Sequence, residues 1–82
     1  MIFLYIPADD ESVDPMYEMR LNNYAQTGIH IQCAGAYGGG YMVNECGGEG
    51  ADFWLRHIAD VRTLAKAKAI AIAYYEKRKQ AA

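Results

Sequence analysis

The chain has 82 residues, of which 52% are hydrophobic, 22% are charged and 12% are aromatic, and its formal net charge is −2. This length and composition indicate a single globular domain over residues 1–82 with a modest core, and they exclude a disordered chain. The apolar run at residues 1–8 is far too short to span a bilayer, and it lacks the basic region of a signal peptide. We therefore expect a cytoplasmic protein that does not contact a membrane.

The chain opens with a predicted strand and an acidic loop. Residues 1–6 are rich in β-branched and aromatic side chains, and Pro7 follows them, which is typical of a strand and its end. Residues 8–14 contain four acids and are expected to form a loop.

The next segment fits two kinds of element. An aspartate–proline pair at residues 14–15 is a good helix start, and Tyr17 and Leu21 follow at helical spacing, so we predict a helix over residues 15–26. Tyr17, Met19 and Leu21 also alternate as apolar residues do in a strand, and the sequence leaves this alternative open.

From Ile29 onward, the apolar period changes to two. Ile29 and Ile31 fall on one face and His30 falls on the other, which is typical of a half-buried strand. The glycines at 38–40 indicate a turn, and residues 41–46 resume the alternation. We therefore predict a β-hairpin here.

A third strand and a long helix complete the predicted domain. Residues 52–58 follow a second glycine-rich turn, and Asp60 or Thr63 caps a helix that runs to about Lys79 and is dense in alanine and lysine. The expected fold class is α+β, in the order β-α-β-β-β-α, with an antiparallel three-stranded sheet packed under the C-terminal helix.

Charge is distributed unevenly along the chain. Residues 1–60 carry nine acids and two arginines, a net charge of −7, whereas residues 61–82 carry six basic residues and one glutamate, a net charge of +5. Such a dipolar domain can steer charged partners. The basic residues also complement the C-terminal end of a helix, which is the simpler explanation of their position.

The chain has two cysteines, Cys33 and Cys46, whose relation depends on the strand register. A two-residue turn at residues 39–40 would place them directly opposite each other, and a three-glycine turn would place them on opposite faces. Both cysteines then act as small buried apolar residues in a reducing cytosol, or they form a disulfide in the first register.

The residue types that carry chemistry do not form a recognisable motif. His30 and His57 lie on predicted strands without a nucleophile placed beside them, and the only serine, Ser12, lies among acids. The cysteine and histidine spacings match no usual zinc-binding pair, and the glycine clusters precede strands rather than the helix that a phosphate loop requires. We therefore expect a protein that is not an enzyme and has no metal or cofactor.

Two surfaces are candidates for partner binding. The apolar residues Ile29, Ile31, Phe53 and Leu55 are predicted to turn inward. Trp54 and Arg56 then point out of the open sheet face, where Tyr41 joins them if the turn has two residues. In the alternative, Trp54 is covered by the first strand or helix. The second candidate is the acidic loop, whose carboxylates would meet a basic surface. Its residues are Asp9, Asp10, Glu11 and Asp14.

Two resemblances bear on function. Residues 15–79 resemble a double-stranded RNA-binding domain through the phrase Leu-Asn-Asn-Tyr-Ala-Gln at 21–26 and the Ala-Lys pattern at 63–68. The resemblance implies an α-β-β-β-α order and phosphate contacts from Lys66 and Lys68. The small, acidic, tyrosine-rich chain is also similar in style to phage-encoded anti-CRISPR inhibitors, which implies binding to a host defence complex in the host cytoplasm.

The net negative charge of residues 1–60 favours a protein partner over nucleic acid. Neutralisation of phosphates by basic groups supplies most of the affinity for nucleic acid, and acidic groups cannot provide it. The sequence therefore predicts a phage inhibitor that binds a CRISPR effector or other defence complex and blocks nucleic-acid engagement or a subunit contact. The alternative is a module that binds double-stranded nucleic acid through the last helix. A homodimer through a sheet edge, or through the end of the helix at Tyr74 and Tyr75, is a further expectation.

Overall fold

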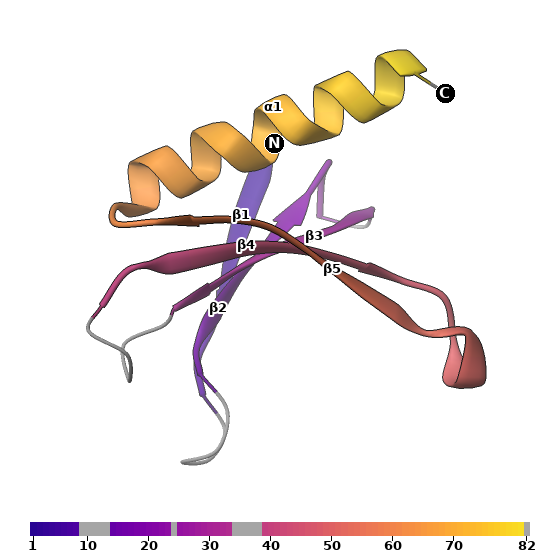
Figure 1. Ribbon diagram of the computed structural model, residues 1–82, viewed down its shortest axis with the longest axis horizontal. Helices are drawn as coiled ribbons and strands as arrows, with labels where there is room; N and C mark the ends of the chain where they lie inside the picture. Colours follow the sequence, from indigo (N-terminus) through magenta and orange to yellow (C-terminus); the bar gives the residue numbers. More distant parts are fainter. Residues whose placement is uncertain (9–13, 24, 34–38, 82) are drawn as a thin grey trace.

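Five antiparallel strands follow one another across a single sheet in the order of the chain, and one long helix crosses one face of that sheet (Figure 1). The computed structural model describes residues 1–8, 14–23, 25–33 and 39–81. The elements are β1 (Ile2–Ile6), β2 (Met16–Arg20), β3 (Gln26–Cys33), β4 (Tyr41–Gly47), the short 3-10 helix η2 (Gly50–Asp52), β5 (Trp54–Val61) and α1 (Leu64–Ala81).

The predicted fold class is wrong in its first helix and in its number of strands. The segment predicted as a helix over residues 15–26 contains β2, which pairs with β1 on one side and with β3 on the other. The alternation of Tyr17 and Met19 therefore decides the local structure. The aspartate–proline pair at 14–15 does not start a helix, because the carbonyl of Pro15 accepts a hydrogen bond from the amide of Cys33 at 2.9 Å.

The first strand is present, and it joins the sheet as its edge. Phe3 of β1 lies opposite Met19 of β2, and Tyr5 lies opposite Tyr17, with ring centroids 5.1 Å apart. This non-local pairing raises the number of strands in the sheet from three to five, since β1 and β2 extend the meander of β3, β4 and β5. It also removes the first helix of the α-β-β-β-α order.

The C-terminal helix begins where one of the two predicted caps places it. The hydroxyl of Thr63 accepts a hydrogen bond from the amide of Lys66 at 3.2 Å, and α1 starts at the next residue, Leu64. Asp60, the other predicted cap, lies in β5.

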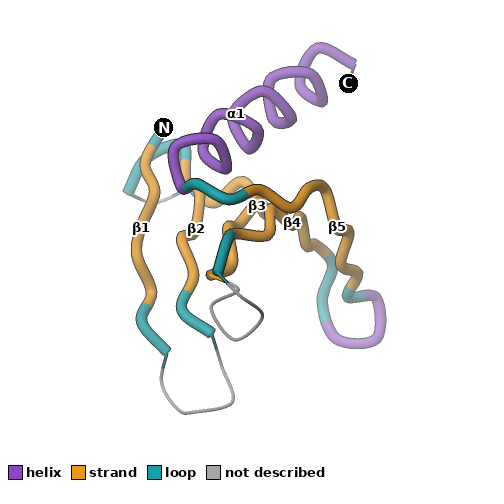
Figure 2. Tube along the Cα trace, turned by 60° about the vertical axis from the view of Figure 1, so that its left-hand side comes forward, coloured by secondary structure: helices purple, strands orange, loops and turns teal. Residues whose placement is uncertain are grey.

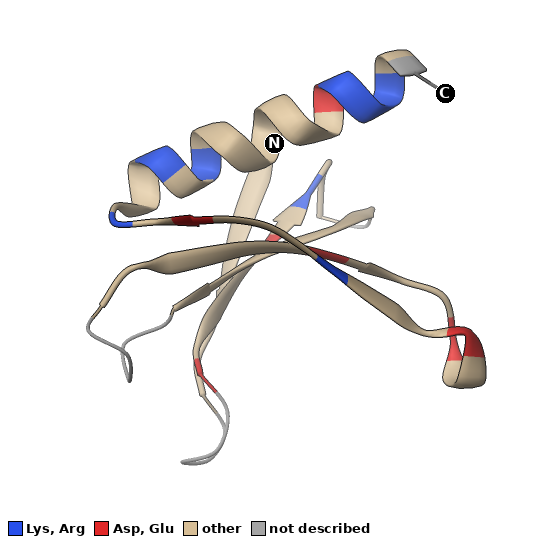
Figure 3. Ribbon diagram, in the orientation of Figure 1, with Lys and Arg blue, Asp and Glu red and all other residues tan. Residues whose placement is uncertain are grey.

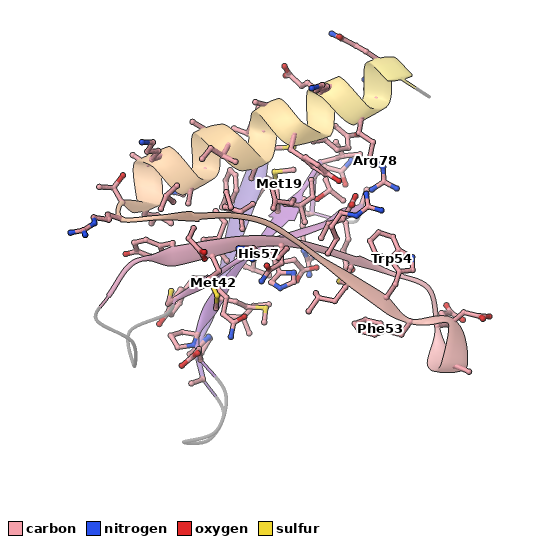
Figure 4. The ribbon with its side chains drawn as sticks, in the orientation of Figure 1. Met19, Met42, Phe53, Trp54, His57 and Arg78 are labelled. Carbon is pink, nitrogen blue, oxygen red and sulfur yellow. The ribbon has the colours of Figure 1, made fainter. Side chains whose placement is uncertain are left out.

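The core lies between α1 and one face of the sheet (Figure 2). The side chains of the sheet that are almost fully buried there include Met19, Ile29, Ile31 and Val43. Small residues of α1 at Ala67 and Ala71 are also fully buried, so the helix backbone approaches the sheet closely. Met19 lies between the sheet and α1, and Met42 lies on the other side of the sheet (Figure 4).

A bulge in β5 changes which side chains face the helix. Ala59 pairs with Val43, and His57 pairs with Asn44, so Ile58 is the extra residue between these two pairs. Without the bulge, the odd-numbered residues of β5 would continue on the helix side. With it, Trp54 and Arg56 take that side and Leu55 takes the open one.

The register of β3 and β4 separates the two cysteines. Cys33 lies opposite Tyr41, so the register that would oppose Cys33 to Cys46 is wrong. Cys33 shares the helix side with Ile31, whereas Cys46 lies on the open side, and both are free thiols. Burial raises the pKa of the Cys33 thiol, and the carboxylate of Asp14 adds to this effect.

A second irregularity, between β2 and β3, depends on a glycine. The register shifts between Glu18 and Arg20, and Gly28 has a positive φ of 84°. A Cβ atom at Gly28 would lie 2.6 Å from the carbonyl oxygen of Cys46, so no side chain fits there. Thr27 reinforces the bulge, because its hydroxyl donates to the carbonyl of Met19 at 2.9 Å and accepts from the amide of Ile29 at 3.1 Å.

We predict that Gly28→Ala lowers the free energy of unfolding by about 3 kcal/mol, because it adds a backbone clash to an unfavourable φ. Gly39→Ala is the matched control, since Gly39 also has a positive φ but no heavy atom lies within 4 Å of its added Cβ. The control is expected to cost about 1 kcal/mol. Urea unfolding followed by circular dichroism measures both, and equal losses would show that the contact with Cys46 is unimportant.

Candidate functional site

The open face of the sheet carries a row of polar side chains across four strands. Glu18 of β2 lies opposite His30 of β3, which lies opposite Asn44 of β4, which lies opposite His57 of β5. We call these four residues the polar row. Strand pairing brings them to one line at the middle of the face, although they are up to 39 positions apart in the chain.

Hydrogen bonds hold one end of the polar row. Nδ1 of His57 lies 2.9 Å from Oδ1 of Asn44, and Nε2 of His57 lies 3.2 Å from a carboxylate oxygen of Asp60. Both ring nitrogens therefore have an oxygen partner, and the imidazole is fixed in orientation. In the described ranges, neither histidine hydrogen-bonds to a serine, threonine or cysteine side chain, so no nucleophile–base pair is formed there.

His30 occupies the middle of the row in a half-buried position. Burial lowers the pKa of His30, and the nearby carboxylate of Glu18 opposes this shift only in part. The neutral imidazole is therefore favoured in the folded protein.

An apolar cavity of about 350 Å³ lies beside the polar row, and Glu18 and His30 form part of its wall. The other side chains and backbone that line it come from strands β2 to β5 and from the residue before β5; they include Met16, Gly28, Cys46, Phe53 and Leu55. Phe53 is 59% exposed and Leu55 is 61% exposed, so large apolar surfaces stand at the rim in contact with solvent. Single exposed leucines are ordinary, but adjacent apolar residues beside a cavity mark a binding surface.

A different cluster lies on the helix side of the sheet, around the carboxylate of Glu45, which is 1% exposed. The hydroxyl of Tyr74 donates a hydrogen bond to Oε1 of Glu45 at 2.9 Å, and Nη1 of Arg56 lies 4.0 Å from the same oxygen. Arg78 forms an ion pair with the other carboxylate oxygen. We call Glu45, Arg56, Tyr74 and Arg78 the carboxylate cluster; Figure 4 shows Arg78 and the neighbouring Trp54 at this end of the molecule.

The structure separates the three residues predicted to form one partner surface on the open face. Trp54 pairs with Gly47 and Arg56 pairs with Glu45, so both lie on the helix side, and the prediction that they point out of the open face is wrong. The bulge at Ile58 is the cause. Tyr41 is also on the helix side, but it packs against the core at the opposite end of β4, six residues or roughly 20 Å from Gly47.

Of the predicted acidic surface, only the last residue is described. Asp9, Asp10 and Glu11 lie outside the described residues. Asp14 accepts a hydrogen bond from the side-chain amide of Gln32 at 3.3 Å, which ties the end of the loop to β3.

The two lysines predicted to contact phosphates lie in different surroundings. Lys66 is exposed in the first turn of α1. The ammonium group of Lys68 lies over the rings of Phe3 and Tyr17, 5.3 and 5.7 Å from their centroids, so it packs against the sheet. The structure does not bring these lysines together as a pair that faces solvent.

Sequence patterns did not reveal Glu45, Asn44 or the apolar rim formed by Phe53 and Leu55. Glu45 is two residues beyond Val43 and four beyond Tyr41, in phase with the inward face, and a carboxylate in such a position signals a buried ion pair. Phe53 and Leu55 were predicted to face inward because they are apolar, and their exposure follows from the same bulge that turns Arg56 toward α1.

Comparison with known proteins does not assign the chain to a family. It matches no protein-family model, no curated protein and no solved structure. Within the described ranges, no three histidine, cysteine or acidic side chains gather in a group able to hold a metal ion. No helix of the described residues combines the length and the hydropathy that crossing a bilayer requires.

We predict that His30 makes folding stability depend on pH. Its pKa is below the unfolded value of about 6.5, so the unfolded chain binds a proton first as the pH falls. The stabilisation is present above about pH 6.5 and is lost as the pH falls through that value toward the folded pKa. His30→Gln should therefore lose less free energy of unfolding than the wild type between pH 7.5 and 5.

Urea unfolding at a series of pH values measures this difference. The matched control is His57→Gln, which leaves His30 and its contribution in place. A His30→Gln variant with the same pH dependence as the wild type would contradict the assignment to His30.

Proposed function

We propose that this chain is a non-enzymatic binding protein that receives a partner protein on the open face of its sheet. The observation that carries the proposal is the apolar cavity, with Phe53 and Leu55 exposed at its rim and the polar row beside it. The helix covers one face of the sheet, and Figure 2 shows no described element over the other.

The chemistry of this face is that of a protein interface. Such interfaces combine a desolvated apolar centre with polar groups at the rim, and a few aromatic or aliphatic anchors supply most of the binding energy. Here, the centre is the cavity, and Glu18, Gln26 and His30 are the polar groups in its wall. A partner that inserts one aromatic or aliphatic side chain, and hydrogen-bonds to these groups, fits this arrangement.

The identity of the partner is a further proposal. A host defence complex, blocked by a phage-encoded inhibitor, remains the partner that the style of the sequence suggests. The acidic loop would contribute electrostatic attraction to such a complex through its carboxylates, and Asp14 would lie beside the contact, because it hydrogen-bonds to Gln32 on the open face.

We predict that a capped aromatic amino acid, N-acetyl-tryptophanamide, binds weakly in the cavity. In amide chemical-shift mapping by NMR, the expected shifts are those of Gly28, His30, Cys46 and Leu55, whereas the amides of α1 stay in place. An aromatic ring fits because the cavity wall is mainly apolar and open to solvent at Phe53 and Leu55.

Leu55→Ser should weaken the binding of N-acetyl-tryptophanamide about fivefold, as measured by the same amide shifts. The domain should stay folded, since Leu55 is exposed. Leu21→Ser is the matched control, because Leu21 is an exposed leucine that does not line the cavity. Shifts scattered over the whole domain, or equal binding by the Leu55→Ser and Leu21→Ser variants, would contradict the proposal.

A further inference from the structure

A second cavity, of about 380 Å³, lies on the helix side of the sheet, where the C-terminal half of α1 passes over the ends of β4 and β5. Its lining differs from that of the apolar cavity, because it includes an indole ring and two cations. Residues from β4, β5 and α1 line it, among them Glu45, Gly47, Trp54, Arg78 and Lys79.

The ring of Trp54 forms a platform in this cavity. A Cβ atom at Gly47 would lie 2.7 Å from the ring, so the indole rests directly against the backbone of β4 and needs a glycine there. Trp54 is nevertheless 38% exposed, which leaves part of the ring open to solvent. An indole that rests on the backbone and is partly exposed provides a surface on which another planar ring can stack.

Positive charge surrounds the platform. The guanidinium carbon of Arg56 lies 5.6 Å from the centroid of the Trp54 ring, and that of Arg78 lies 6.0 Å from it. Both arginines are exposed and share one buried carboxylate, that of Glu45, so with Lys79 the site carries three positive charges against one negative charge. Glu45 thereby pairs with both guanidinium groups and cancels only part of their charge.

We infer that this second cavity binds single-stranded nucleic acid, with a base stacked on Trp54 and the adjacent phosphates at Arg78 and Lys79. An acidic protein segment would satisfy the cations but has no use for the indole platform. A nucleotide presents both a planar ring and an anionic group within one repeating unit, and it therefore matches the whole lining.

The surrounding charges determine the path of the bound nucleic acid over the surface. The C-terminal half of α1 is mainly basic, whereas η2, at the start of β5, is acidic (Figure 3). Asp52 and Glu49 repel phosphates from that turn, so the backbone of the bound strand runs along α1. This site is separate from Lys66 and Lys68, which belong to the first two turns of the helix.

Intrinsic fluorescence tests the site directly, because Trp54 is the only tryptophan in the chain. The probe is an oligouridylate of about eight nucleotides, titrated at low salt. A stacked base is expected to quench the emission of Trp54 with a saturable curve. The affinity should fall with salt with a log–log slope of about −1.4, as expected for phosphates bound by two cations.

Substitutions separate stacking from charge. Arg78→Gln should raise the Kd about fivefold, and Lys79→Gln should raise it about threefold. Lys66→Gln, a matched change at an exposed lysine in the first turn of α1, should leave the Kd within about 1.5-fold of the wild type. Trp54→Leu, followed by the anisotropy of a labelled oligouridylate, should raise the Kd about tenfold.

Three outcomes would overturn the inference. The first is the absence of saturable quenching at low salt. The second is binding of inorganic polyphosphate or polyglutamate, which lack a stacking base, as tightly as oligouridylate. The third is an equal effect of Lys66→Gln and Lys79→Gln on the Kd. Lys79→Gln keeps the test valid if Arg78→Gln proves unstable, because Lys79 is exposed and takes no part in the carboxylate cluster. Circular dichroism melting confirms that each variant is folded.

Discussion

The arrangement of helix and sheet depends on the hydrogen bond and ion pairs of one buried carboxylate, that of Glu45. A carboxylate without partners is very costly in a nearly dry environment, and this one is 1% exposed. Its partners come from two other elements: Tyr74 and Arg78 from α1 and Arg56 from β5. The requirement to satisfy one charge therefore positions the C-terminal half of α1 over β4 and β5. Toward the other end of α1, the small side chains of Ala67 and Ala71 allow close packing on the sheet.

The position of Glu45 has consequences for both candidate surfaces. On the helix side, it orders the two arginines beside Trp54. The ion pair with Glu45 also requires Arg56 to face the helix. Because of the bulge at Ile58, Arg56 can lie on the same side of β5 as Ala59 and Val61. The same change of phase turns Leu55 to the open face, where it borders the apolar cavity. A single irregularity thus links the buried ion pairs to the exposed binding surface.

The open face is a consequence of size as well as of register. One helix covers only one face of a five-stranded sheet, and a chain of 82 residues has no second helix in its described part to cover the other. The polar row keeps this face from being uniformly apolar, since Asn44, His57 and Asp60 hydrogen-bond among themselves. Exposed apolar side chains also remain on this face, with Phe53 and Leu55 beside the cavity and Ile2 and Leu4 on β1.

Local sequence signals predict part of this structure. The alanine- and lysine-rich composition predicts α1 and Thr63 predicts its start, and the alternation at Ile29 and Ile31 predicts the inward face of β3. Helical spacing gave the wrong element at residues 15–26, because β2 is stabilised by pairing with β1 and β3, which no local window contains. Likewise, the turn glycines suggested a tight hairpin, whereas β3 ends at Cys33 and β4 begins only at Tyr41.

The candidate sites were harder to predict than the helices and strands, because they depend on which face of the sheet each side chain occupies. Trp54 and Arg56 were predicted to bind a partner from the open face. They lie on the helix side because of a bulge that has no recognisable signal in the sequence. Glu45 shares a face with Tyr41 and Val43, but its burial could be predicted only once the register of β3 against β4 was known, because that register decides which face these residues occupy. The polar row requires the registers of three strand pairs at once.

A double-mutant cycle between Glu45 and Arg78 tests most directly whether the carboxylate holds the helix to the sheet. Urea unfolding of the wild type, Glu45→Gln, Arg78→Gln and the double variant gives the coupling free energy of the pair. We expect a favourable coupling of about 1 to 2 kcal/mol, because each residue loses its partner in the other's variant. Additive effects, with a coupling within about 0.3 kcal/mol of zero, would contradict it and would leave apolar packing alone to position α1.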